Sequence, residues 1–129
     1  MPKWRGISRT TTRTYCVNVY EAEKKKLKNL LQKVDKISLT TDCWKSKNQE
    51  MEYLVIAGYW IHQNWQLQKR VLNLVRILPP HRGLEIVDAI WCYMEDWDIE
   101  SKIHTVSVDN ASVNDSVLFH VKMYAQRKK

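Results

Sequence analysis

The spacing of hydrophobic positions changes several times along the chain, and each change marks a predicted element. Over residues 15–35, apolar residues recur at intervals of three and four, which predicts one face of an amphipathic helix. Residues 1–14 are polar and show no such period, with Arg9 and Arg13 set among threonines. We therefore expect a flexible basic arm over residues 1–14, followed by a helix over residues 15–35.

The period then shortens to that of β-strands. Residues 36–41 form a short alternating run, and residues 53–61 are apolar at both odd and even positions. A strand that is apolar on both faces belongs in the middle of a sheet. Residues 65–78 alternate less regularly, and the polar turn at residues 62–64 predicts an antiparallel hairpin that joins this third strand to the second.

The last third of the chain predicts a helix, a strand and a further helix. The prolines at 79–80 end the third strand because proline donates no ladder hydrogen bond. An apolar stripe over residues 84–97 then predicts a helix, and residues 103–108 alternate as a strand. Asn110 or Ser112 is placed to cap a last helix.

The order of these elements indicates the fold class. A strand that follows a crossover helix is most simply parallel to a strand already in the sheet. We therefore predict an α/β fold whose mixed sheet contains three antiparallel strands plus one parallel strand, with flanking helices.

Two aspartates occupy the same position relative to a predicted strand. Asp42 and Asp109 each follow a short run of alternating Ser/Thr and aliphatic residues. In α/β sheets the carboxyl ends of strands meet at one crevice, where ligands bind. Two carboxylates held together there favour a bound cation such as Mg²⁺, which prefers oxygen ligands. A second interpretation stays open, in which Asp42 turns the chain and Asp109 initiates the last helix.

The net charge of +7 is concentrated near the amino end. Residues 1–50 hold 12 Lys/Arg against 5 Asp/Glu, whereas residues 51–129 hold 9 of each. This distribution is typical of a protein that binds nucleic acid, although a solvated helix face explains the lysines equally well. The candidate phosphate contacts are Arg9, Arg13, Lys45 and Lys47.

Other kinds of site find little support in the sequence. The three cysteines and four histidines show no spacing typical of a disulfide framework or a zinc site. No apolar run approaches the roughly 20 residues that span a bilayer, and no signal peptide opens the chain. We expect a cytosolic or nuclear protein. The six tryptophans could stack on bases, but at their spacing most are more simply core residues, and Trp44 is expected to pack at a turn.

Four runs of the sequence carry a family resemblance: "SRTTTRTYCVNVYEAEKKKLKNLL", "ISLTTDCWKS", "YLVIAGYWIHQNWQLQKRVLNLVRILPPHRG" and "TVSVDNASVND". In order and spacing they resemble the first part of the catalytic region of plant hAT-superfamily transposases. The resemblance is closest to domesticated zinc-finger BED domain proteins of the RICESLEEPER type, and it covers about residues 7–115.

The resemblance implies a ribonuclease-H-like fold in which three acidic residues bind Mg²⁺ or Mn²⁺ for DNA strand cleavage and transfer. Asp42 matches the first acid and Asp109 the second. The third acid of the family, a glutamate, lies further downstream than this chain extends. We therefore expect an incomplete ribonuclease-H-like domain over residues 36–121, a basic tail over residues 122–129, and exposed apolar surface where covering elements are missing.

The expected function follows from that incomplete set of acids. We expect a nuclear, DNA-related protein that is catalytically inactive as it stands. The BED zinc finger and the dimerisation region of the family have no counterpart in the chain, so no homodimer is expected. Two alternatives remain, which are a non-catalytic module that binds DNA or protein, and a pseudogene product without a selected role.

Overall fold

The computed structural model describes residues 6–47, 51–77 and 83–109. The predicted last helix and the basic tail lie outside these residues. The chain divides into two compact units, Met1–Lys33 and Val34–Lys129. The first contains the helix α1 (Arg9–Leu31), and the second contains β1 (Ile37–Lys45), β2 (Glu52–Ile61), β3 (Leu67–Ile77), α2 (Gly83–Asp96), the short 3-10 helix η1 (Glu100–Lys102) and β4 (Ile103–Val108).

Helix α1 begins six residues earlier than the sequence pattern predicts. Ser8 caps it, because the Ser8 hydroxyl accepts a hydrogen bond of 3.1 Å from the backbone N–H of Thr11. The hydroxyl of Thr12 donates to the carbonyl of Ser8, four residues back. Because this first turn is polar, it shows no hydrophobic period from which a helix could be predicted. The prediction of a flexible arm is wrong from residue 9 onward, where α1 begins. Arg9 and Arg13 lie on the helix, on neighbouring turns of one side.

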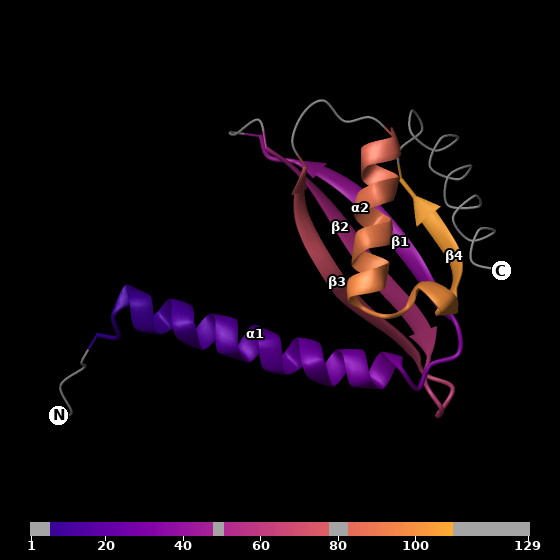
Figure 1. The fold of residues 1–129 in the computed structure, drawn as a ribbon, viewed down its shortest axis with the longest axis horizontal. Helices are drawn as coiled ribbons and strands as arrows, with labels where there is room; N and C mark the ends of the chain where they lie inside the picture. Colours follow the sequence, from indigo (N-terminus) through magenta and orange to yellow (C-terminus); the bar gives the residue numbers. More distant parts are fainter. Residues whose placement is uncertain (1–5, 48–50, 78–82, 110–129) are drawn as a thin grey trace. The chain divides into compact units, whose positions relative to one another are not determined.

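The second unit contains a four-stranded sheet in the order β3-β2-β1-β4 (Figure 1). Strands β1 and β2 pair antiparallel, as do β2 and β3, whereas β4 pairs parallel to β1. Helix α2 lies over one face of the sheet. This arrangement confirms the predicted mixed sheet and the predicted central position of the second strand.

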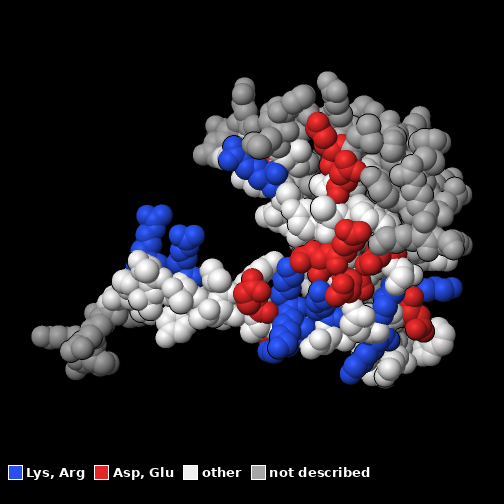
Figure 2. All heavy atoms as spheres, in the orientation of Figure 1, with Lys and Arg blue, Asp and Glu red and all other residues white. Residues whose placement is uncertain are grey.

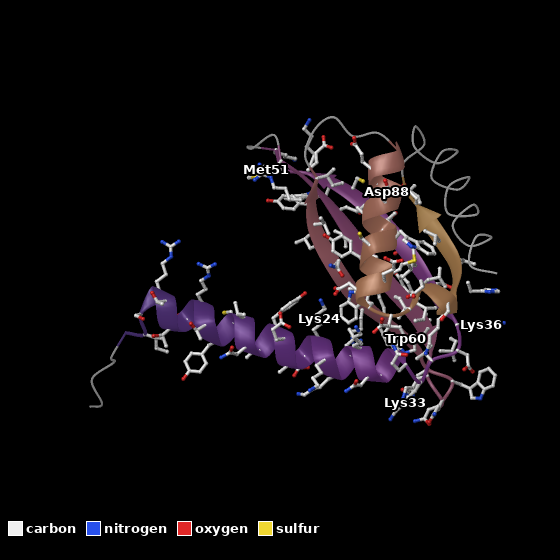
Figure 3. All side chains as sticks on the ribbon, in the orientation of Figure 1. Lys24, Lys33, Lys36, Met51, Trp60 and Asp88 are labelled. Atoms are coloured by element: carbon white, nitrogen blue, oxygen red, sulfur yellow. The ribbon has the colours of Figure 1, made fainter. Side chains whose placement is uncertain are left out.

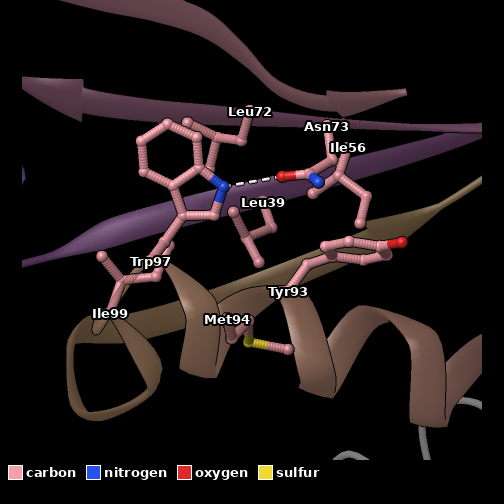
Figure 4. A pocket seen from close by; sticks show the side chains of 8 residues that line it. All are labelled: Leu39, Ile56, Leu72, Asn73, Tyr93, Met94, Trp97 and Ile99. Carbon is pink, nitrogen blue, oxygen red and sulfur yellow. Dashed lines mark hydrogen bonds between the residues drawn. The ribbon is translucent and has the colours of Figure 1, made fainter. Parts of the chain in front are cut away.

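The core lies between α2 and the sheet. Alternate residues of β2 are buried there, and the side chain of Ile56 packs with Leu39 of β1 and Met94 of α2 (Figure 4). The helix stripe predicted from the sequence is largely confirmed, with one exception. Trp91 is only half-buried, and its indole Nε1 donates to Glu95 Oε1 at 3.0 Å, which is a contact on the surface.

A β-bulge in β3 changes which residues reach this core. The pairing of β2 with β3 shifts register between Ile56 and Ala57. As a result, the consecutive residues Leu72 and Asn73 both point toward α2. Leu72 fills the core, and the Asn73 side-chain oxygen accepts a hydrogen bond of 2.6 Å from the indole Nε1 of Trp97. This bond joins the end of α2 to the sheet.

Figure 3 labels Met51, just before β2, and Trp60, near the end of β2, and these residues mark the two ends of the sheet. Strand β1 runs antiparallel to β2, so the carboxyl ends of β1 and of its parallel neighbour β4 lie at the Met51 end. Within the described residues, no helix is both long and apolar enough to cross a membrane.

The hydrogen bond between Trp97 and Asn73 predicts a difference between two tryptophans of the same region. Trp97→Phe keeps most of the buried ring but leaves the Asn73 oxygen without its donor, which costs about 1–3 kcal/mol. Trp91→Phe removes a donor to an exposed carboxylate, and its cost is expected to stay within about 0.5 kcal/mol. Urea unfolding of both variants measures the difference, and equal midpoints would show that the bond contributes nothing.

Candidate functional site

Asp42 lies within strand β1 rather than after it. The backbone of Asp42 pairs with Val55 of β2, and β1 continues to Lys45, which pairs with Glu52. The predicted strand over residues 36–41 is therefore too short. The interpretation of Asp42 as a residue that turns the chain is wrong, because its backbone is part of a ladder.

Asp109 lies beside Asp42. Thr41 and Val108 are partners in the parallel pairing of β1 with β4, and the backbone N–H of Asp109 donates to the Thr41 carbonyl at 3.2 Å. The backbone contact thus reaches one residue beyond Val108, and Asp109, just after β4, lies beside Asp42 of β1. Neighbouring strands lie about 4.8 Å apart, so both carboxylates can reach a common ligand.

Both aspartates project from the face of the sheet opposite α2, which we call the open face. Side chains alternate along a strand, and Leu39 and Thr41 are buried on the α2 face. Asp42, one position after Thr41, therefore points to the open face, and the parallel register gives Asp109 the same direction. Both residues are exposed.

The open face beside the aspartates carries an aromatic pair. Trp44 follows Asp42 by two positions and is 58% exposed. Its ring lies 5.9 Å, between centroids, from the ring of its cross-strand partner Tyr53, at an interplanar angle of 34°. The prediction that Trp44 packs at a turn is wrong, because Trp44 belongs to the paired part of β1.

Cys43 and Lys45 alternate with Asp42 and Trp44 along β1, so they point to the α2 face. Lys45 Nζ lies 3.5 Å from Glu52 Oε1, which places this predicted phosphate contact on the side of the sheet away from the aspartates. Lys47 is exposed just after β1. Burial raises the pKa of the Cys43 thiol above its ordinary value, and the nearby charges of Asp42 and Glu52 raise it further.

The ligand chemistry of the site fits a hard divalent cation. Asp42 and Asp109 offer carboxylate oxygens, the ligands that Mg²⁺ and Mn²⁺ prefer, and their exposure leaves room for water and substrate. Within residues 6–47, 51–77 and 83–109, no group of three or more Asp, Glu, His or Cys side chains gathers around a common point. The described site is therefore a pair of carboxylates.

Comparison with known protein families places this geometry in context. The family model of the ZBED1 RNase-like domain matches residues 40–129, a segment that contains both aspartates. The chain belongs to this family of RNase-like domains. The mixed sheet with its parallel fourth strand confirms the predicted partial ribonuclease-H-like fold for the domain.

Similar full-length proteins identify the ancestry of this RNase-like domain. The chain is 36% identical over 109 residues to "Putative AC transposase" of Zea mays, an alignment that covers 84% of this chain and 13% of the relative. It is 28% identical over 129 residues to zinc finger BED domain-containing protein RICESLEEPER 2 of Oryza sativa subsp. japonica, covering 98% of this chain and 18% of the relative. RICESLEEPER 3 of the same organism is 28% identical over 130 residues, covering 99% of this chain and 17% of the relative.

These relatives confirm the resemblance to hAT-superfamily transposases and RICESLEEPER-type proteins, so the RNase-like domain is transposase-derived. The chain spans less than a fifth of the length of these relatives. The sequence predicted that Asp42 and Asp109 form one site, which stays a prediction, but it gave no expectation of the exposed aromatic pair. The available signal was the alternation of Thr40, Asp42 and Trp44, which a longer predicted strand would have placed on one face.

The proximity of Cys43 to Asp42 predicts a chemical readout for this site. Asp42→Asn removes one of the negative charges that raise the Cys43 pKa, so more thiolate forms at pH 8 and alkylation by iodoacetamide accelerates. A divalent cation bound at Asp42 should act in the same direction in the wild-type domain.

Mass spectrometry of the digested protein measures each cysteine separately. The exposed Cys16 and Cys92 serve as internal references whose rates should not change. A Cys43 rate that is the same in wild type and in Asp42→Asn would show that the two groups do not interact.

Proposed function

We propose that this chain is the part of a transposase-derived, ribonuclease-H-like domain that supplies two ligands of a divalent metal site acting on DNA. The observation that supports it is the adjacency of Asp42 and Asp109 on neighbouring parallel strands, on one exposed face. The relatives add that proteins with this domain include transposases and zinc-finger BED proteins.

The chemistry assigned to the site follows from its ligands. Mg²⁺ or Mn²⁺ held by Asp42 and Asp109 would polarise a phosphate oxygen and lower the pKa of a bound water. The protein's own contribution is to hold the two carboxylates at fixed positions on paired strands, so that binding requires little rearrangement. The two carboxylates found among the described residues give weak binding by themselves, and we propose that the 129-residue polypeptide binds DNA without cutting it.

The charge distribution supports the open face as the side that DNA approaches. Among residues 85–102, six charged side chains are acidic and one, Lys102, is basic; the acidic ones are Glu85, Asp88, Glu95, Asp96, Asp98 and Glu100. Figure 2 shows this concentration of acidic side chains on the face that carries α2. Strand β3 contains no acidic residue, and of its basic residues Lys69 and Arg76 lie on the open face, whereas Arg70 lies on the α2 face. A polyanion is therefore repelled from the acidic surface more strongly than from the open face.

The open face is expected to attract DNA only when a cation is bound there, because its own side chains carry no net charge. Among the described strand residues, alternation places Asp42, Lys69 and Arg76 on this face, and Asp109 lies at the same side just after β4. Two negative and two positive side chains give a local net charge of zero. One bound divalent cation changes it to +2, so metal and DNA should bind cooperatively.

A second candidate function is a non-catalytic DNA-binding module. The observation in its favour is the basic helix α1, which carries Arg9, Arg13 and four lysines against two glutamates. In this case the aspartates would contribute nothing to DNA affinity.

For either function we propose a nuclear location, and we propose that the chain acts as a monomer.

Metal binding is the direct test of the site. Mn²⁺ titration followed by electron paramagnetic resonance is expected to show one site with a dissociation constant on the order of a millimolar, as for cations with few protein ligands. Asp42→Asn and Asp109→Asn should each abolish it. Asp35→Asn, which changes the same charge at an exposed position away from the paired strands, is the matched control and should bind like wild type.

A nicking assay with supercoiled plasmid tests the proposed lack of cleavage. The wild-type polypeptide is expected to leave the plasmid intact with either Mg²⁺ or Mn²⁺. Nicking that disappears in Asp42→Asn would overturn this part of the proposal and show that two carboxylates are sufficient. Mn²⁺ binding that is unchanged in Asp42→Asn would instead reject the site and favour the non-catalytic module.

The salt dependence of DNA affinity distinguishes the basic residues. Binding to duplex DNA should weaken as salt rises, with a log-log slope that becomes shallower by about one for each lost phosphate contact. Arg13→Gln is expected to reduce the slope in this way. Lys45→Gln is the control and should leave it unchanged, because Lys45 pairs with Glu52 on the α2 face. An affinity that does not depend on salt would exclude DNA as a ligand of the polypeptide.

A further inference from the structure

Strand β3 forms one edge of the sheet. Among the described residues it pairs with β2 alone, so one side of its backbone faces no other strand (Figure 1). An edge strand can accept a further strand from a partner, because its outward N–H and C=O groups continue the hydrogen-bond ladder. With 11 residues β3 is long for a strand, and it contains no proline that would prevent such pairing.

The hairpin that joins β2 to β3 determines which residues of β3 point outward. The backbone N–H of His62 donates to the Gln66 carbonyl at 2.9 Å, which closes the hairpin. In an antiparallel ladder, hydrogen-bonded pairs alternate with pairs whose backbone groups point away from each other. Leu67, which follows Gln66, therefore directs its N–H and C=O away from β2. By the same alternation, so do Lys69 and Val71.

A side-chain contact agrees with this outward direction. Arg70 Nη1 donates to the Lys69 carbonyl at 2.8 Å, whereas a carbonyl that pointed into the β2 ladder would bond to β2. Both residues are exposed, so the backbone of an incoming strand can replace the guanidinium at this carbonyl. The displaced guanidinium is then free to bind a carboxylate of the incoming strand.

The charge of β3 indicates what kind of strand can pair there. Lys69 and Arg70 are consecutive, point to opposite faces and have no acidic neighbour in β3. Lys69 Nζ lies 5.3 Å from the centroid of the Tyr59 ring, which holds this charge on the open face. Like charges on paired strands repel, so a second copy of β3 is disfavoured and an acidic strand is favoured.

Two exposed apolar residues flank Lys69 on the open face. Leu67 is 67% exposed and Val71 is 59% exposed. Lysine residues and a bulge commonly protect an edge strand from pairing, but that protection does not require exposed leucine and valine side chains. Apolar surface of this kind is covered by apolar side chains of a partner. A DNA backbone would meet the charges and leave the apolar side chains and the outward backbone groups without partners.

We propose that residues 67–71 of β3 bind an extended acidic segment of a partner protein as an additional strand. The segment pairs with the backbone of Leu67, Lys69 and Val71, and its acidic side chains lie beside Lys69 and Arg70. The bulge at Leu72 interrupts the regular register and so limits the pairing to residues 67–71. This inference does not rest on the metal site, because β2 separates β3 from β1.

The probe is a short peptide designed against these residues, Thr-Val-Glu-Glu-Thr-Val-Thr. In the antiparallel direction, its valines face Val71 and Leu67 and its glutamates face Arg70 and Lys69. Amide hydrogen exchange of the 129-residue polypeptide, followed by nuclear magnetic resonance, is the readout. Saturating peptide should slow exchange at Leu67, Lys69 and Val71 by about tenfold or more. Exchange at Gln68 and Arg70, whose N–H groups already bond to β2, should not change.

Modified peptides and protein variants separate backbone pairing from charge attraction. N-methylation of the two valines keeps every side chain but removes two ladder donors, and it should weaken binding by about tenfold or more. Lys69→Glu should weaken binding by about 2- to 30-fold. A peptide with lysines in place of the glutamates should bind the double variant Lys69→Glu, Arg70→Glu and not the wild type.

Arg76→Glu is the matched control. Arg76 is an exposed basic residue of the same strand but lies beyond the bulge, so its reversal should change peptide affinity by less than about twofold.

Three other results would overturn the proposal. Equal affinity for the N-methylated peptide, or no slowed exchange at millimolar peptide, would show that β3 does not accept a strand. Duplex DNA that displaces the peptide and slows the same amides would assign the edge to nucleic acid. Slow exchange at Leu67, Lys69 and Val71 that increases with the concentration of the polypeptide alone would assign it to a second copy of the chain.

Discussion

The parallel pairing of β1 with β4 is the constraint on which the site depends. It is extended by the hydrogen bond from the Asp109 backbone to the Thr41 carbonyl, and it brings together two carboxylates from distant parts of the sequence. Parallel strands need a crossover, and here α2 provides it. The position of β4 therefore depends on how firmly α2 is held on the sheet. The Trp97 bond to Asn73 and the apolar core beneath α2 hold it there, so the packing of one face determines the geometry of the other.

The bulge in β3 shows how the sheet keeps its two faces different. Without the extra residue, strict alternation would place Leu72 and Asn73 on opposite faces, and one of them would be lost to the core. The bulge gives the α2 face both a buried leucine and the acceptor for Trp97. It also resets the alternation that follows, so that Leu74 and Arg76 reach the open face. Arg76 therefore lies on the open face because of a local irregularity in β3.

The sequence could predict the elements whose hydrophobic period is strong. Helix α2, the central strand β2 and the mixed strand directions of the sheet follow from alternation, from stripe spacing and from the crossover helix. The end of β1 could not be read in the same way, because Asp42, Cys43 and Trp44 carry no apolar alternation and the pairing with β2 alone keeps them extended. The start of α1 was missed because a serine cap and threonine hydroxyls stabilise it without any apolar face. The alternation before each aspartate predicted that both lie near the same edge of the sheet, but the position of Asp42 inside β1 and the shared face required the register.

The open face carries two features that do not stabilise the folded domain. Apart from Trp44, it exposes Ile61, Leu67, Val71 and Leu74, each by more than half, and an apolar surface of this kind usually marks a binding site. Two carboxylates at adjacent positions repel one another, which opposes the pairing of the strands that carry them. Neither feature adds to stability, and the core under α2 must offset both. A cation bound between the aspartates would relieve their repulsion, and DNA that lies over the open face would cover the exposed apolar side chains. This is the physical reason to regard the two features as one site.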